Sequence, residues 1–152
     1  MKVVIFAGGY GSRLGSLTSN TPKPLIKLNG TPIIWHIMKY YSIFGLNDFI
    51  ILGGYKYKVL QNYFSQNKKK FSTNNVNWNI KVVNTGKNTM TGGRLKRIKN
   101  LLVDGDDFCL TYGDGLSDLN IAKQIKFHKK KKKLATILAV HPPARFGLLN
   151  IK

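Results

Sequence analysis

The sequence predicts an α/β protein in which a mostly parallel sheet carries helices on both faces. Short apolar, β-branched runs alternate with amphipathic segments along the chain, and strands joined through helices run parallel. The first apolar run leads directly into a glycine-rich loop. With 152 residues and 43 % hydrophobic content, the chain can build one core, so we expect a single domain over 1–152.

The expected strands are the apolar runs Lys2–Ala7, Asp48–Gly53, Trp78–Asn84, Phe108–Tyr112 and Leu134–His141. The expected helices lie between them, at Pro32–Phe44, Lys56–Gln66, Gly92–Leu102 and Asn120–Lys132. Pro32 opens the first helix and Gly45 follows its end, as helix termini prefer. This order predicts a Rossmann-like sheet, whose ligands bind at the carboxyl ends of the strands.

The charge of the chain is strongly positive, with 25 Lys and Arg against 6 Asp and a formal net charge of +19. Lysines occur in every segment and are denser only at Lys68–Lys70 and Lys129–Lys133. The second run ends a predicted helix, where cations suit the helix dipole. No aromatic residues interleave with these runs, so we expect no specific nucleic-acid partner. A basic nucleic-acid binder remains an alternative that rests on charge alone.

Two features concern the cellular compartment and the redox state. The apolar stretch at the start is short and ends in glycines, and no segment approaches the length of a membrane span. We therefore expect a cytoplasmic protein without a membrane partner. The chain has one cysteine, Cys109, in the apolar run Phe108–Leu110, which excludes a disulfide within the chain and predicts a buried, inert thiol.

The loop Gly8–Leu14 is the most informative segment of the chain. It is not a Walker A motif, which needs Gly-Lys-Ser/Thr, nor a dinucleotide fingerprint, because Leu14 stands where the last glycine belongs. Arg13 within it and Lys23 after it add two cations. Phosphates at such a turn gain backbone amides that no Cβ obstructs. A nucleoside triphosphate, a dinucleotide and a turn shaped only by sterics stay open at this point.

Asp114 lies between Gly113 and Gly115 directly after an apolar strand, which predicts a carboxylate exposed at the edge of the sheet. Mg²⁺ prefers one or two carboxylates together with substrate phosphates and water. The alternative is that these residues form a simple turn. The three histidines stand far apart and match no hydrolytic triad or zinc pattern.

Transfer of a nucleotidyl group onto an existing phosphate fits this set of residues. The attacking oxygen is already anionic, so the protein only has to align the reactants and offset their charge. No general base is then required.

Three motifs in this order resemble the sugar-phosphate nucleotidyltransferases: Gly8-Gly9-x-Gly11-Ser12-Arg13-Leu14, Pro22-Lys23-Pro24-Leu25 and Tyr112-Gly113-Asp114-Gly115. Within that superfamily, Trp35–Lys39, Met90–Arg97 and Pro142-Pro143-x-Arg145-Phe146-Gly147 resemble the glucose-1-phosphate cytidylyltransferases. Members of that family make CDP-glucose and pyrophosphate from CTP and glucose 1-phosphate, for deoxysugar synthesis in bacterial polysaccharides. The resemblance therefore implies a transferase with these two substrates.

The resemblance also implies a role for individual residues. The nucleotide would be lined by Phe6, Ala7, Gly8, Gly9, Tyr10, Gly11, Ser12 and Arg13. Arg13 and Lys23 are the expected catalytic residues: Arg13 would hold the triphosphate with the loop amides, and Lys23 would bridge the phosphates and steady charge at the α-phosphorus. Thr89 and Arg94 would complete the nucleotide site, Gly113 would lie against the nucleoside, and Asp114 would hold Mg²⁺.

In the family, a second metal-binding Asp and most sugar contacts come from a C-terminal part, and the full-length enzymes are homo-oligomers. This chain ends in what resembles the middle of the catalytic domain. We therefore expect 1–152 to be the nucleotide-binding portion, with an open sheet edge where later strands would pair. The alternatives are a non-catalytic remnant that binds CTP, or a related transferase that uses UTP or dTTP.

Overall fold

The computed structural model describes residues 1–11, 15, 18–67, 77–103 and 105–140. Ser12, Arg13, His141 and the block 142–147 lie outside the described residues. The chain divides into two compact units, Met1–Asp118 and Leu119–Lys152. No helix in the described part of the chain is long and apolar enough to cross a membrane.

The first unit is built on a four-stranded sheet in the order β5-β4-β1-β6, and every neighbouring pair is parallel. Its strands are β1 (Lys2–Ala7), β4 (Asp48–Gly53), β5 (Asn79–Asn84) and β6 (Phe108–Tyr112). In the register Phe6 pairs with Leu52 on one side and Tyr112 on the other. The predicted α/β fold class is confirmed. Because all four strands run parallel, the loops that follow them emerge on the same side of the sheet, at the carboxyl ends of the strands.

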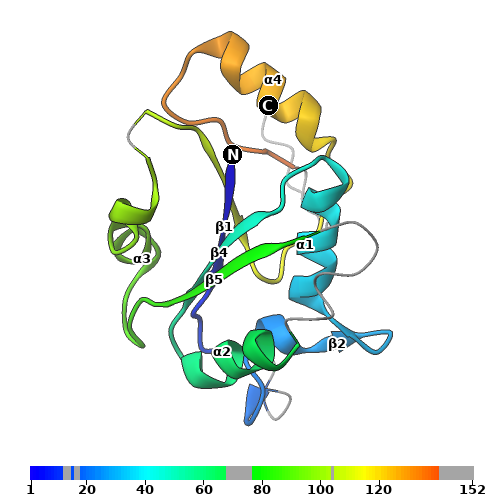
Figure 1. The fold of residues 1–152 in the computed structure, drawn as a ribbon, viewed down its shortest axis with the longest axis vertical. Coiled ribbons are helices and arrows are strands. Elements are labelled where there is room, and N and C mark those ends of the chain that lie inside the picture. The colour runs from blue at the N-terminus through cyan, green and yellow to red at the C-terminus, as the bar shows by residue number, and fades with distance from the viewer. Residues whose placement is uncertain (12–14, 16–17, 68–76, 104, 141–152) are drawn as a thin grey trace, which may run out of the picture. The chain divides into compact units, whose positions relative to one another are not determined.

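Helices cover the two faces of this sheet (Figure 1). In the chain's first unit they are α1 (Ile33–Ile43), α2 (Tyr57–Gln66) and α3 (Thr91–Lys96), with short 3₁₀ turns η2 (Lys23–Leu25) and η4 (Lys99–Leu101). A small hairpin pairs β2 (Lys27–Leu28) with β3 (Thr31–Pro32). The single helix predicted at 92–102 is therefore two shorter pieces, α3 and η4.

The core follows from the alternation of side chains along the strands. On one face Val4, Ile50 and Leu52 pack with Ile98, which lies between α3 and η4. On the other face the buried strand residues are Val3, Ile5, Phe49 and Ile51, and the buried residues of α1 are Ile34, Ile37 and Met38. Each fully buried aliphatic side chain contributes about 1.5–3 kcal/mol, so both layers stabilise the sheet that carries the loops.

The second unit contains α4 (Ile121–Lys131), whose first turn is capped by Asn120: its Oδ1 accepts the Lys123 N–H at 2.9 Å. The strand predicted at Leu134–His141 was wrong over 134–140, which form no strand, and His141 is not described. Leu134 and Ile137 are 107 % and 89 % exposed. An apolar run becomes a strand only where a neighbour pairs with it, and no described strand pairs with this segment.

Two further predictions concern β6. It is an edge strand of the described sheet, and Leu110 and Tyr112 are exposed there, as expected for an open edge. Cys109 is a free thiol, but it is half-buried rather than buried. Burial raises the pKa of this thiol, which lowers its reactivity.

Candidate functional site

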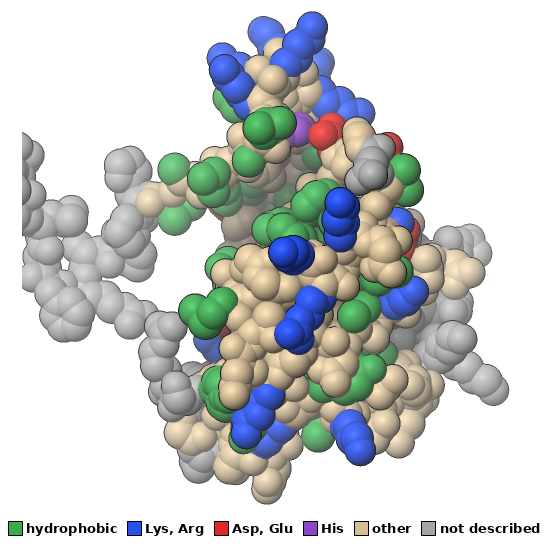
Figure 2. Space-filling model, turned by 90° about the vertical axis from the view of Figure 1, so that its left-hand side faces the viewer, with side chains coloured by type: hydrophobic (Ala, Val, Ile, Leu, Met, Phe, Trp, Pro, Cys, Tyr) green, Lys and Arg blue, Asp and Glu red, His purple; other side chains and the backbone are tan. Residues whose placement is uncertain are grey.

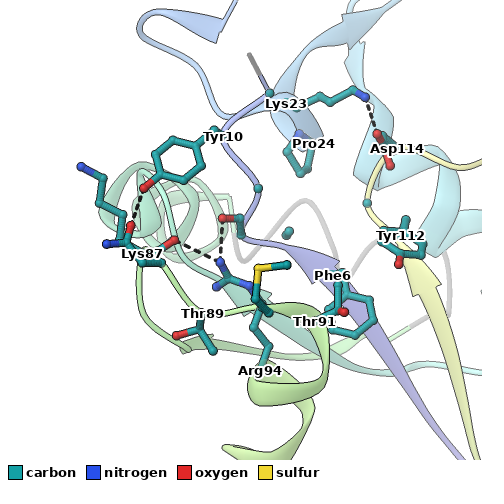
Figure 3. Close-up of a pocket in the computed structure, with 17 residues that line it drawn as sticks. Phe6, Tyr10, Lys23, Pro24, Lys87, Thr89, Thr91, Arg94, Tyr112 and Asp114 are labelled. Atoms are coloured by element: carbon teal, nitrogen blue, oxygen red, sulfur yellow. Dashed lines mark hydrogen bonds and ion pairs between the residues drawn. The ribbon is translucent and has the colours of Figure 1, made fainter. Parts of the chain in front are cut away.

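A cavity of about 450 Å³ opens in the first unit, beside the ends of β1 and β6 (Figure 3). Its lining residues are Phe6, Ala7, Gly8, Gly9, Tyr10, Gly11, Lys23, Pro24, Lys87, Asn88, Thr89, Met90, Thr91, Arg94, Tyr112, Gly113 and Asp114. They come from four stretches that are distant in the sequence. The cavity therefore exists only because the parallel strands end at the same level.

The structure brings together every predicted site residue that it describes. These residues are Phe6, Ala7, Gly8, Gly9, Tyr10, Gly11, Lys23, Thr89, Arg94, Gly113 and Asp114. The Gly113 N–H donates to the Phe6 carbonyl at 2.8 Å, which holds the loop after β6 against the end of β1. Ser12 and Arg13 are not among the described residues, so their expected roles stay predictions.

Arg94 is the most constrained charged side chain of the cavity, because it is only 6 % exposed. Its Nη1 donates to Gly53 O (3.2 Å), Thr85 Oγ1 (2.7 Å) and Gly86 O (2.8 Å), and its Nη2 to Gly8 O (3.0 Å) and Lys87 O (3.3 Å). Burial lowers the pKa of the guanidinium, and neighbouring Arg97 lowers it further. The side chain joins the last residue of β4 to the segments after β1 and β5, so its first effect is to position the glycine loop.

Two glycines make room for this guanidinium. A Cβ at Gly8 or at Gly54 would overlap Arg94, whereas a Cβ at Gly9 would meet nothing within 4 Å. The Gly8 carbonyl also accepts the Tyr55 N–H at 3.2 Å. A glycine is thus required at position 8 because the Arg94 side chain approaches the backbone closely. At Gly9 no atom of the described residues crowds the backbone, which is therefore accessible to a ligand.

Lys23 and Asp114 form an ion pair at another part of the cavity wall (Figure 3). Each side chain is 33 % exposed. Lys23 begins the turn η2, after Pro22, and Asp114 follows the end of β6. Pro24 lies close to Gly113, where an added Cβ would come within 3.1 Å of the proline ring. The packing therefore holds a cation and a carboxylate side by side with solvent access.

The donor set limits what kind of metal site this chain can form. Among the described residues, no three His, Cys, Asp or Glu side chains are grouped so that they could hold a metal ion. Asp114 offers a single solvent-accessible carboxylate inside the cavity. One carboxylate, completed by substrate phosphates and water, suits Mg²⁺, so the residues present fit a metal ion that arrives with a phosphorylated ligand.

Tyr10 links the glycine loop to the segment after β5. Its ring packs on that of Tyr55 with centroids 5.0 Å apart, and its hydroxyl donates to Asn88 Oδ1. Lys87 Nζ lies 5.8 Å from the Tyr10 centroid and 5.9 Å from the Tyr55 centroid. These contacts anchor the loop on the side opposite Lys23 (Figure 3).

Six lining residues were not among the predicted site residues: Pro24, Lys87, Asn88, Met90, Thr91 and Tyr112. Four of them stand in the motifs described above, whereas Lys87 and Asn88 do not. Most of the six follow β5, and the general rule that ligands bind at the carboxyl ends of parallel strands could have found that segment. Lysine and arginine side chains also occur over much of the face shown in Figure 2, between hydrophobic ones. Lys87 therefore did not stand out in the sequence as a site residue.

The profile of the nucleotidyl transferase family matches residues 2–152. The chain belongs to this family. The glucose-1-phosphate cytidylyltransferase of Salmonella typhimurium (strain LT2) is 45 % identical over 167 aligned residues, which cover 100 % of this chain and 65 % of that relative. The chain thus spans just under two thirds of the length of this curated relative. The resemblance derived from the motifs is confirmed.

Solved structures of other proteins share this fold. HddC from Yersinia pseudotuberculosis, in complex with GMP-PN, matches with a TM-score of 0.67 and 27 % identity over 84 % of this chain and 53 % of that one. The CTP:phosphocholine cytidylyltransferase LicC from Streptococcus pneumoniae matches with a TM-score of 0.59 and 28 % identity over 79 % of this chain and 47 % of that one. The Salmonella relative and LicC are both named as cytidylyltransferases.

Proposed function

We propose that this chain is the nucleotide-binding part of a glucose-1-phosphate cytidylyltransferase, which makes CDP-glucose and pyrophosphate from CTP and glucose 1-phosphate. The observation that carries the proposal is the cavity itself, where an open glycine loop faces Lys23 and Asp114. The choice of CTP and of glucose 1-phosphate is supported by the name of the 45 % identical Salmonella relative.

In the proposed reaction, a phosphate oxygen of glucose 1-phosphate attacks the α-phosphorus of CTP. The bond from that phosphorus to the bridging oxygen breaks, and pyrophosphate leaves with the electron pair. The attacking oxygen is anionic, so no side chain has to remove a proton. The tasks left to the protein are alignment and charge stabilisation.

The described residues divide these tasks. Backbone amides of the Gly8–Gly11 segment would bind the phosphates, as glycine turns at strand ends do. Lys23 would offset the charge that develops at the α-phosphorus, and Arg94 keeps the loop in place through the Gly8 carbonyl. Arg13, which lies outside the described residues, would add a second cation to the loop.

Asp114 would hold a Mg²⁺ ion, which supplies charge neutralisation at the phosphate oxygens when bound. Lys23 now pairs with this carboxylate, and it would exchange that partner for a phosphate oxygen of the substrate. The ion pair therefore keeps both groups in place for ligands of opposite charge.

Turnover is proposed for a protein that includes the remaining part of the domain, because the resemblance assigns most sugar contacts and a second Asp to that part. For residues 1–152 alone, the proposal is CTP binding. A remnant that binds CTP without turnover is the second candidate, and it is motivated by the 65 % coverage of the Salmonella relative.

The test has two stages. Thermal shift and calorimetry with CTP, UTP and dTTP in Mg²⁺ should show CTP as the ligand that stabilises the chain most. Pyrophosphate release with CTP, Mg²⁺ and glucose 1-phosphate should then separate the enzyme from the remnant. Absence of any nucleotide-dependent shift would refute both candidates, and stronger stabilisation by UTP or dTTP would refute the choice of CTP.

A further inference from the structure

Lys87 is a cation of the cavity that has no role in the proposed reaction. It lies after β5 and lines the cavity together with the glycine loop. Among the lining residues that the structure describes, the other cations already have polar partners: Lys23 pairs with Asp114, and Arg94 donates to backbone carbonyls and Thr85. The contacts of the Lys87 ammonium are instead the faces of two tyrosine rings.

The position of Lys87 is set by its backbone rather than by its ammonium. Its carbonyl accepts from Arg94 Nη2 at 3.3 Å, and the next residue, Asn88, accepts the Tyr10 hydroxyl. The segment is therefore tied to the glycine loop from two sides, while the Lys87 side chain remains exposed. A long, flexible stem on a fixed backbone can deliver its charge to a ligand on that loop.

The charge of the proposed ligand calls for a cation in addition to Lys23 and the expected Arg13. The described lining carries Lys23, Lys87 and Arg94 against the single carboxylate of Asp114. Lys23 is assigned to the α-phosphorus and Arg94 is committed to the backbone, whereas most of the negative charge of a triphosphate is on its terminal phosphates. An exposed cation–π contact is weaker than a charge-assisted hydrogen bond to phosphate, so the ammonium would leave the rings for that partner.

We propose that Lys87 binds the terminal phosphates of the nucleotide, the part that departs as pyrophosphate. The inference rests on the proposed nucleotide-binding function and adds a residue that neither the motifs nor the resemblance pointed to. The rings of Tyr10 and Tyr55 hold the ammonium beside the glycine loop. Lys87 thereby distinguishes a triphosphate from a monophosphate of the same nucleoside.

The experiment compares the dissociation constants of CTP and CMP for the wild-type chain and for Lys87→Gln, by calorimetry in Mg²⁺. We expect the variant to weaken CTP binding about tenfold and CMP binding less than about twofold, the loss of one charge-assisted contact. Lys96→Gln is the matched control, because Lys96 is an exposed lysine of α3 outside this cavity and the change in net charge is the same. It should leave both constants unchanged.

Lys87→Arg should restore CTP binding to within about threefold of wild type, because the charge is kept on a similar stem. Equal weakening of CTP and CMP by Lys87→Gln would overturn the inference by assigning Lys87 to the nucleoside, and no weakening would overturn it by leaving Lys87 as a solvated lysine. In both cases the proposed function survives. If the wild-type chain binds neither nucleotide, the proposed function fails and this inference with it.

Discussion

Arg94 and the Lys23–Asp114 pair lie in the same cavity but are held in different ways. Arg94 is 6 % exposed and donates to four backbone carbonyls and a hydroxyl. Lys23 and Asp114 are 33 % exposed and pair with each other. The guanidinium of Arg94, whose donors are satisfied mostly by the backbone, therefore holds the structure together. The ammonium of Lys23, whose partner is another solvent-accessible side chain, is the one proposed to bind a ligand.

The largest effect expected from this difference is on stability, when the hydrogen bonds of the Arg94 guanidinium are lost. Arg94→Met should lower the free energy of unfolding by about 3 kcal/mol or more, because it leaves several buried carbonyls without a donor. Arg94→Lys should recover only part of this loss, since one ammonium cannot reproduce the planar fork. Urea denaturation of the three proteins measures it. If the free energy of unfolding of Arg94→Met differs from wild type by less than about 1 kcal/mol, Arg94 does not stabilise the fold as proposed.

Substitution of Gly8, which lies against Arg94, should have a smaller effect on stability, and the neighbouring Gly9 provides the control. Gly8→Ala should destabilise the chain by about 2 kcal/mol, because the new Cβ overlaps the guanidinium. Gly9→Ala should stay within about 0.5 kcal/mol of wild type, since its Cβ meets nothing within 4 Å. Thermal melts of both variants test the pair, and equal destabilisation would contradict the proposed reason.

The ion pair should show the opposite balance between stability and binding. Asp114→Asn should change the free energy of unfolding by less than about 1 kcal/mol, because the pair is partly exposed. Its affinity for CTP in Mg²⁺ should fall about tenfold or more, because an amide is a poorer magnesium ligand than a carboxylate. Calorimetry measures the affinity and urea denaturation the stability.

Omission of Mg²⁺ is the internal control for that variant. Without the ion, Asp114→Asn should bind CTP at least as well as wild type, because a negative charge beside the triphosphate has been removed. Weaker binding under both conditions would instead assign Asp114 to direct contact with the nucleotide.

The smallest expected effect is that of salt on the two regions. Raising the salt concentration about tenfold should weaken CTP binding severalfold, because the Lys23 ammonium is solvent-accessible and therefore screened. The destabilisation caused by Arg94→Met should change little, since the guanidinium is buried. If the CTP affinity and the destabilisation by Arg94→Met respond equally to salt, Arg94 and the Lys23–Asp114 pair do not differ in the way proposed.

Much of the fold was predictable from local patterns. Four of the five expected strands form, because their apolar runs are short, β-branched and bounded by turn residues. The run from Leu134 failed because a strand also requires a pairing partner, which a local pattern cannot reveal. The loops after β1 and β6 were identified as site segments through their glycines, whereas Lys87 was missed among the chain's many lysines.

The sequence by itself determined the α/β class, the family and the loops that surround the cavity, because strand ends and glycine turns are local properties. Only the tertiary structure decided how deeply the charged residues are buried and which partners they meet. Arg94 reaches the Gly8 carbonyl across 86 positions of the chain, and Lys23 meets Asp114 only because η2 lies beside the end of β6. Burial and partners are properties of the packed chain, and they separate the arginine that builds the site from the lysines available to a ligand.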